Sequence, residues 1–129
     1  MTASEKSIEI ARAAAKAAAA KIARDITALD VSDRLVITDV FLIASAPNER
    51  QVNAIVDSIE EELHKQGLRP VRREGRSEGR WVLLDYAEVI IHVQHEEDRV
   101  FYALERLWKD CPAIDLQLEE APRQVADAE

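Results

Sequence analysis

The segment Val36 to Ser45 reads VITDVFLIAS, and this nearly continuous run of β-branched and aromatic residues decides the fold. Apolar residues without alternation are typical of a central strand that is covered on both faces. Pro47 ends the strand, because proline cannot donate a hydrogen bond to a β-ladder. The chain is therefore expected to build a β-sheet with helices packed on it.

One helix is expected before this strand in the sequence and one after it. Residues 5–27 are rich in alanine and carry apolar residues at three- and four-residue spacing, which predicts an amphipathic helix, and Ala28 to Val31 is a short strand candidate. Asn48 and Gln51 have the spacing of a helix start in which two side chains satisfy free backbone donors. Gly67 is expected to end that second helix. Its apolar stripe consists of Val52, Ile55, Val56, Ile59 and Leu63.

The second half of the chain predicts three more strands and a last helix. Pro70 to Glu74 suits an edge strand, and Trp81 to Asp85 and Val89 to Val93 have the spacing of an antiparallel hairpin. The last helix begins with acids from Glu96 onward and ends before Pro112. Its predicted apolar stripe consists of Val100, Phe101, Leu104, Leu107 and Trp108. Together these elements predict a single α/β domain whose mixed sheet has about five strands, with helices packed on it.

We place this domain at residues 1–110, with the N-terminal helix included, since 129 residues suit one folded unit. Residues 111–129 are expected to form an acidic, flexible tail, because residues 110–129 hold six acids and one arginine. The longest apolar runs are far too short for a membrane span, and the N-terminus lacks the pattern of a secretory signal. With a single cysteine, Cys111, these features favour a cytoplasmic protein without a membrane partner.

Charge is unevenly distributed along the chain. A net charge of -8 argues against sequence-independent binding to free DNA, which depends on cationic groups. Between Arg69 and Arg80, however, five arginines are accompanied by only two glutamates. This arginine cluster is either a solvated loop or a contact to RNA phosphates or to an acidic protein face.

Catalytic and metal-binding groups are sparse. His92 and His95 precede Glu96, but a zinc site needs three or four convergent ligands, so His92 is better explained as a structural or interface histidine. Cys111 has no activating base near it in the sequence, and the three glycines do not form a phosphate-binding loop. We therefore expect no cofactor, no metal and no enzymatic activity.

Asp39 and Asp85 support one enzymatic alternative. Both lie in apolar strand segments, and two carboxylates can hold magnesium for phosphoryl transfer. The predicted sheet order also resembles the nucleotidyltransferase fold, whose members carry a Gly-Ser pair at a helix start and two acids one residue apart. Here residues 45–48 read SAPN, and no Asp-x-Asp occurs. The expected topology is thus nucleotidyltransferase-like without the catalytic motif, and metal-dependent nucleotidyl transfer is the alternative function.

Aromatic residues gather near the hairpin and the last helix. Tryptophan and tyrosine anchor protein interfaces because each offers a large rigid apolar area and one polar group. Trp81 and Tyr86 bracket the first hairpin strand, where filling the core and binding a partner explain them equally well. Phe101 and Trp108, on the apolar stripe of the last helix, are better explained as core residues.

Seven short segments occur in a distinctive order over about residues 8–110: Leu29-Asp30-Val31, Thr38-Asp39, Arg50-Gln51-Val52, Glu74-Gly75, Trp81 to Tyr86, Val89 to Val93 and Tyr102 to Trp108. In this order and spacing they resemble the ribosomal silencing factor family, also called RsfS, Iojap or YbeB. The Trp-x-x-x-Asp strand, the histidine-containing strand and the Leu-Glu-x-Leu-Trp helix end carry most of the resemblance. The chain departs from many relatives in two turns, where Ala46-Pro47 and Ala87 stand in place of glycines.

The resemblance implies that the protein binds the large ribosomal subunit through its ribosomal protein number fourteen. Occupancy of that face would block association with the small subunit and repress translation under nutrient limitation or in stationary phase, with no bond made or broken. A role in late large-subunit biogenesis and a homodimer off the ribosome are also implied. Carried onto this sequence, the docking residues would be Trp81, Leu83, Asp85 and Tyr86 first, and His92, Tyr102, Glu105 and Trp108 second.

Overall fold

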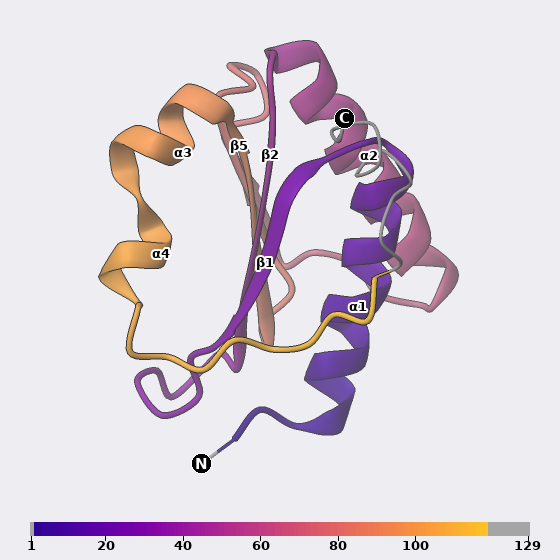
Figure 1. The fold of residues 1–129 in the computed structure, drawn as a ribbon. Coiled ribbons are helices and arrows are strands. Elements are labelled where there is room, and N and C mark those ends of the chain that lie inside the picture. The colour runs from indigo at the N-terminus through magenta and orange to yellow at the C-terminus, as the bar shows by residue number, and fades with distance from the viewer. Residues whose placement is uncertain (1, 119–129) are drawn as a thin grey trace.

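The computed structural model describes residues 2–118, except for the side chain of Phe101. Five strands form one sheet in the order β1-β2-β5-β4-β3. Their bounds are β1 Arg24–Asp30, β2 Val40–Ala46, β3 Arg72–Glu74, β4 Trp81–Asp85 and β5 Val89–His95. Helices α1 (Glu5–Ala20) and α2 (Glu49–Lys65) lie on one side of the sheet, and the short helices α3 (Glu96–Tyr102) and α4 (Leu104–Leu107) lie on the other (Figure 1). The predicted α/β fold with a mixed five-stranded sheet is confirmed.

β2 and β5 form the parallel centre of the sheet, and the other neighbouring strands pair antiparallel. All seven residues of β2 are buried, as an unbroken apolar run predicts. The strand begins at Val40, so the prediction of a strand from Val36 was wrong; Val36 and Ile37 are exposed. Asp39 lies directly before the strand, and its carboxylate accepts a hydrogen bond from Ser7 Oγ of α1 at 2.9 Å.

The predicted hairpin is confirmed. β4 pairs antiparallel with β5, and Leu83 lies opposite His92 in the register. In the connecting turn Ala87 has φ 70, a left-handed conformation that favours glycine. The chain therefore adopts a strained turn here with alanine.

α1 is shorter than the predicted helix over residues 5–27. It ends at Ala20, because Ile22 takes a left-handed φ of 61 and Ala23 N donates back to Ala18 O at 3.1 Å. β1 then begins at Arg24 rather than at Ala28. Small side chains allow close packing of α1 against its neighbours, and those fully buried are Ala11, Ala14, Ala15 and Ala18.

α2 follows the sequence pattern closely. Asn48 Oδ1 accepts a hydrogen bond from Gln51 N at 2.8 Å, as expected for a helix start. The reciprocal half of that prediction was wrong, since the Gln51 side chain donates instead to Lys21 O at 3.1 Å and ties α2 to the end of α1. Gly67 follows the helix with φ 81, and the whole predicted apolar stripe is buried: Val52, Ile55, Val56, Ile59 and Leu63.

The last predicted helix is broken in two. Ala103 has φ 46, which ends α3 and begins α4 with a change of direction. As a result only part of the predicted stripe faces inward: Leu104 is buried, whereas Val100 and Leu107 are exposed. The prediction that Val100 and Leu107 belong to one apolar stripe with Leu104 was therefore wrong.

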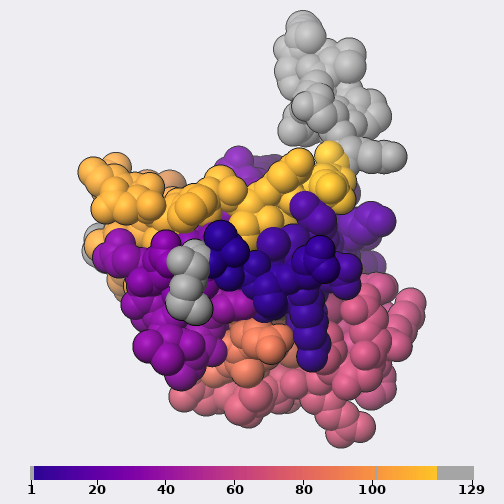
Figure 2. Space-filling model, turned by 90° about the horizontal axis from the view of Figure 1, so that it is seen from below, coloured from indigo at the N-terminus to yellow at the C-terminus, as the bar shows by residue number. Residues whose placement is uncertain are grey.

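Residues 111–118 run along β1 instead of starting a tail at 111. Asp30 N donates to Pro112 O at 2.8 Å, Ile114 N donates to Ala28 O at 2.9 Å, and Leu116 is buried in the core with α1. Figure 2 shows this yellow segment lying against the indigo N-terminal helix. Residues 111–118 therefore pack on the domain, and the rest of the expected tail, residues 119–129, lies outside the described part.

Candidate functional site

Alternation along β4 sorts its side chains onto the two faces of the sheet. Val82 and Leu84 join the buried core with α1 and α2. Trp81, Leu83 and Asp85 point to the other face and are only partly buried. The predicted docking strand therefore presents a tryptophan, a leucine and a carboxylate together, on the side where α3 and α4 lie.

Trp81 is held from two sides on this face. Its Nε1–H donates a hydrogen bond to His92 Nδ1 of β5 at 3.1 Å. The ring of Tyr102, at the end of α3, lies 4.8 Å from the indole between ring centroids, with a 46° tilt. Trp81 stays partly exposed and Tyr102 is 48% exposed, so both rings offer apolar area to a partner.

His92 lies beneath this surface and is itself buried. Its ring makes an edge contact with Phe41 of β2 at 5.1 Å between centroids, and its cross-strand neighbours are Leu83 and Ile43. Burial lowers the pKa of His92 to about 4, so the imidazole is neutral at pH 7. The interpretation of His92 as a structural or interface histidine agrees with this environment.

Phe41 extends the contacts to Trp108, just after α4. The rings of Phe41 and Trp108 meet edge to face at 5.1 Å, and the guanidinium of Arg34 lies 5.3 Å from the Trp108 ring. Five rings thus form a connected row, which we call the aromatic row: Tyr102, Trp81, His92, Phe41 and Trp108. Sequence reasoning placed Phe41 only in a strand; the alternation of side chains along that strand is the signal that would have assigned it to this face.

Asp85 supplies the negative charge at the β3 side of this face. Its Oδ1 accepts a hydrogen bond from Ala87 N at 2.8 Å, and its Oδ2 lies 3.8 Å from Arg72 Nη2. The carboxylate is therefore fixed by the hairpin turn while one oxygen meets an exposed arginine. The Asp85 side chain is only partly exposed, at 20%, so a cationic partner would meet it together with Arg72.

The Glu105 carboxylate forms a salt bridge within the protein. Its Oε2 accepts from Arg99, with Nη2 at 2.8 Å and Nε at 2.9 Å. Arg99 is buried and also donates to Thr27 Oγ1 at 3.3 Å and Ser45 Oγ at 3.2 Å. Glu105 therefore helps to join α4 to α3, β1 and β2, next to the aromatic row.

Tyr86 does not join the other predicted docking residues. It lies in the core on the α2 side of the sheet, and burial raises the pKa of its hydroxyl to about 12. Within the described residues that hydroxyl has no hydrogen-bond partner. The structure thus separates Tyr86 from Trp81, Leu83 and Asp85.

The acids and histidines considered as metal ligands do not lie together, and each contacts different parts of the protein. The Asp39 carboxylate accepts from α1, at Ser7 Oγ, whereas Asp85 faces the α3 side and Arg72. His95 caps α3, with Nδ1 accepting from Glu97 N at 3.1 Å. Over residues 2–118 no group of three or more His, Cys, Asp or Glu side chains converges as a metal site. In the same residues, no helix is both long and apolar enough to traverse a bilayer.

The arginine cluster is largely paired within the chain. Arg73 meets Glu60 of α2 at 2.7 Å and Arg76 meets Asp57 of α2 at 2.6 Å. Arg80, directly before Trp81, pairs with Asp98 of α3 at 2.6 Å and also with carboxylates of Glu49 and Glu97. The cluster therefore ties the loop before β4 to α2 and α3, which anchors the base of the docking strand.

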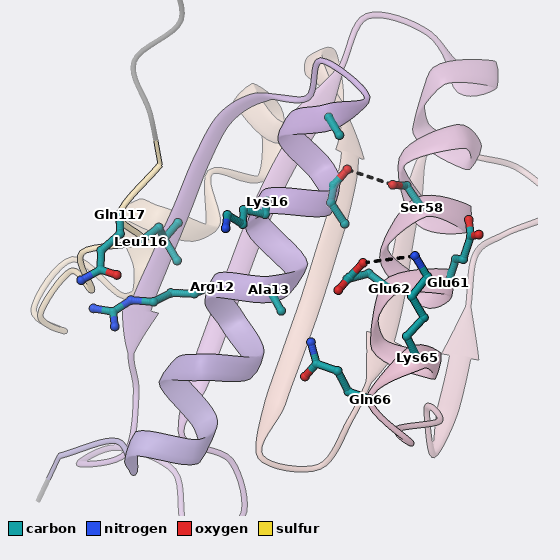
Figure 3. A pocket seen from close by; sticks show the side chains of 12 residues that line it. Arg12, Ala13, Lys16, Ser58, Glu61, Glu62, Lys65, Gln66, Leu116 and Gln117 are labelled. Carbon is teal, nitrogen blue, oxygen red and sulfur yellow. Dashed lines mark hydrogen bonds and ion pairs between the residues drawn. The ribbon is translucent and has the colours of Figure 1, made fainter.

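A groove of about 520 Å³ runs between α1 and α2 on the opposite side of the molecule (Figure 3). Arg12 and Lys16 project from α1, and Glu61, Glu62 and Lys65 project from α2. Its charges are mixed, and Ser58 Oγ closes one end by donating to Ala17 O at 2.9 Å. The side chains that line this groove do not form a recognisable catalytic arrangement. The face that carries Trp81, Leu83 and Asp85 therefore remains the candidate site.

Comparison with known proteins identifies the family to which this chain belongs. The family model described as "Ribosomal silencing factor during starvation" matches residues 4–129. The chain belongs to the ribosomal silencing factor family. This assignment confirms the resemblance drawn from the Trp81 strand, the His92 strand and the helix end at Trp108.

Individual family relatives and a solved structure agree with the assignment. The ribosomal silencing factor RsfS of Bacillus subtilis is 40% identical over 107 residues, covering 83% of this chain and 91% of that protein. A mouse protein named "Mitochondrial assembly of ribosomal large subunit protein 1" is 32% identical over 89 residues, covering 67% of this chain and 39% of that protein. A crystal structure of a Chromobacterium violaceum protein superposes with a TM-score of 0.76 at 30% identity, covering 88% of this chain and 93% of that chain.

Proposed function

We propose that the chain docks on the large ribosomal subunit through ribosomal protein number fourteen and blocks association with the small subunit. The observation that carries this proposal is the partly exposed face formed by Trp81, Leu83, Asp85 and Tyr102. Membership of the ribosomal silencing factor family supports the ribosome as the partner. The expected result of docking is repression of translation when nutrients are scarce.

The chemistry of this face suits a basic protein partner. Trp81 and Tyr102 supply rigid apolar area, and Leu83, which lies opposite His92 and is partly exposed, adds an aliphatic side chain. Asp85 and the net charge of -8 attract a cationic surface, and long-range attraction of this kind mainly raises the association rate. The apolar rings would then slow dissociation.

The proposed action is steric occlusion, which needs no catalytic group. A bound chain would occupy surface that the small subunit requires, so silencing would follow from occupancy alone. The name of the mouse relative refers to assembly of a ribosomal large subunit; we extend that to a second role for this chain in late large-subunit biogenesis. We further propose that the chain acts in the cytoplasm and forms a homodimer when it is off the ribosome.

Co-sedimentation with isolated large subunits tests the docking step. Trp81→Ala is expected to weaken binding by roughly tenfold or more, as is typical for a buried aromatic anchor. Tyr86→Phe is the matched control, because it changes the next aromatic residue of the same hairpin on the opposite face of the sheet. Equal binding by the parent protein and Trp81→Ala would overturn the surface assignment.

A further inference from the structure

His92 is the most buried of the residues assigned to the docking face. His92 is 5% exposed, whereas Trp81 beside it is partly exposed and Tyr102 is 48% exposed. A partner that covers this face would touch the two aromatic rings and would find almost no surface of the imidazole. Any contribution of His92 to docking must therefore pass through a neighbour.

The neighbour is identified by one hydrogen bond. Trp81 Nε1–H donates to His92 Nδ1 at 3.1 Å, so Nδ1 is unprotonated and acts as acceptor. Because burial lowers the pKa of His92 to about 4, the ring stays neutral at pH 7 and carries its proton on Nε2. The bond thus requires one tautomer of a neutral imidazole, which this environment supplies.

The same tautomer leaves an uncompensated polar group. His92 Nε2 is buried and has no hydrogen-bond partner among the described residues. A buried unpaired donor lowers stability, whereas an apolar side chain of similar size at that place would not. A histidine therefore lowers stability at this position relative to an apolar residue. What the histidine offers in return is the hydrogen-bond acceptor at Nδ1, which an apolar residue lacks.

The surroundings make the imidazole a rigid support. Phe41 contacts it edge to face at 5.1 Å, and Leu83 and Ile43 lie opposite it on the neighbouring strands. Tyr102 lies on the Trp81 indole at 4.8 Å. An indole fixed in one orientation loses less freedom on binding than one that rotates, and such preorganisation strengthens association.

We propose that His92 is a positioning residue that holds the Trp81 indole in its docking orientation through the Nε1–H to Nδ1 hydrogen bond, without contacting the partner. This inference rests on the proposed docking function of the Trp81 face. His92 and Trp81 then contribute to the affinity for the large subunit through one shared interaction rather than through two independent contacts.

Three substitutions at position 92 separate the acceptor from the rest of the side chain. His92→Asn places an amide oxygen near the position of Nδ1, His92→Gln places its amide near Nε2, and His92→Leu offers no acceptor. We expect His92→Asn to bind large subunits within about twofold of the parent, and His92→Leu and His92→Gln to bind roughly threefold to tenfold more weakly, the range of one hydrogen bond. In a Trp81→Phe background, His92→Leu should cause no further loss, because the donor is already gone.

A readout on the free protein separates this inference from the proposed function. Hydrogen exchange of the Trp81 indole N–H, followed by NMR, should be slow in the parent and in His92→Asn and fast in His92→Leu. If the parent shows this protection but does not bind large subunits, the proposed function fails while the hydrogen bond stands.

Two results would overturn the positioning role. One is binding by His92→Leu at the parent level although the indole N–H exchanges fast. The other is a further loss of binding when His92→Leu is added to Trp81→Phe, which would mean that His92 acts directly or through general destabilisation. Denaturation curves of each variant control for the second explanation, since His92→Leu is expected to be at least as stable as the parent at pH 7.

Discussion

Asp85 and Tyr86 are consecutive in the chain, yet their side chains lie on opposite faces of the sheet: Asp85 shares the face of Trp81 and Leu83, and Tyr86 is buried in the core on the α2 side. The separation follows from the two-residue period of a β-strand. It divides the residues that the family resemblance groups together into a surface set and a core set. The two sets should respond differently to substitution.

Asp85→Asn should weaken docking without disturbing the hairpin. The amide retains an oxygen that can accept from Ala87 N, now 2.8 Å from Oδ1, but it removes the negative charge. Association with large subunits should slow and should depend less steeply on salt, which stopped-flow measurements at two ionic strengths would detect. An unchanged salt dependence would remove Asp85 from the docking face.

Tyr86→Phe should leave docking intact and should not reduce stability. The hydroxyl is buried without a partner in the described residues, so its removal relieves an unpaired polar group. We expect the free energy of unfolding to be unchanged or up to about 1 kcal/mol higher, measured by urea denaturation. A loss of several kcal/mol would show that the hydroxyl has a stabilising partner.

Gly75 should be intolerant of any side chain, because it supports the docking strand. It has φ +85, and a Cβ built there would lie 2.0 Å from the backbone oxygen of Trp81. Gly75→Ala is expected to cost about 3 kcal/mol or more and to displace the start of β4. Gly67 is the matched control. It has φ +81, and among the described residues no atom beyond its chain neighbours lies within 4 Å of the corresponding Cβ, so Gly67→Ala should cost only about 1 kcal/mol. Similar losses in the two variants would contradict the close contact.

The depressed pKa of His92 predicts a pH dependence of stability. The pKa is lowered from 6.5 to about 4 by burial, so between these values the unfolded chain binds more protons than the folded protein. Above pH 6.5 the imidazole is neutral in both states and this effect costs no stability. As the pH falls from 6.5 through 4, proton uptake by the unfolded chain lowers the free energy of unfolding by about 3 kcal/mol. His92→Leu should therefore lose less stability than the parent between pH 7 and pH 4 in parallel denaturation series. Parallel curves for the two proteins would mean that His92 titrates normally.

Local patterns predicted the elements whose side chains follow one period without interruption. The α2 stripe from Val52 to Leu63 is buried as expected, and the β4–β5 hairpin has the expected pairing. The errors lie where tertiary contacts override a pattern: α1 stops before the periodicity does because Ile22 turns left-handed, and the last helix breaks at Ala103. Neither Ile22 nor Ala103 is a residue type that favours a left-handed backbone conformation, so the local sequence does not predict either break.

The candidate site was predictable in part. Trp81, Leu83 and Asp85 could be placed on one face from alternation alone, and the same rule would have excluded Tyr86. The Trp81–His92 contact lies within the predicted β4–β5 hairpin. The Phe41–His92 contact depends on the β2–β5 pairing, and that long-range pairing is not encoded in the local sequence. The aromatic row therefore emerges only with the fold.

Subunit joining is the most direct test of the central claim. Purified large and small subunits are mixed after the large subunit has been preincubated with the parent protein, with Trp81→Ala or with Tyr86→Phe, and joined ribosomes are quantified by sedimentation. The account predicts that the parent and Tyr86→Phe stay with the large subunit and reduce the joined fraction, while Trp81→Ala leaves joining close to that without protein. Unimpaired joining in the presence of the parent protein, or equal inhibition by the parent and Trp81→Ala, would contradict it.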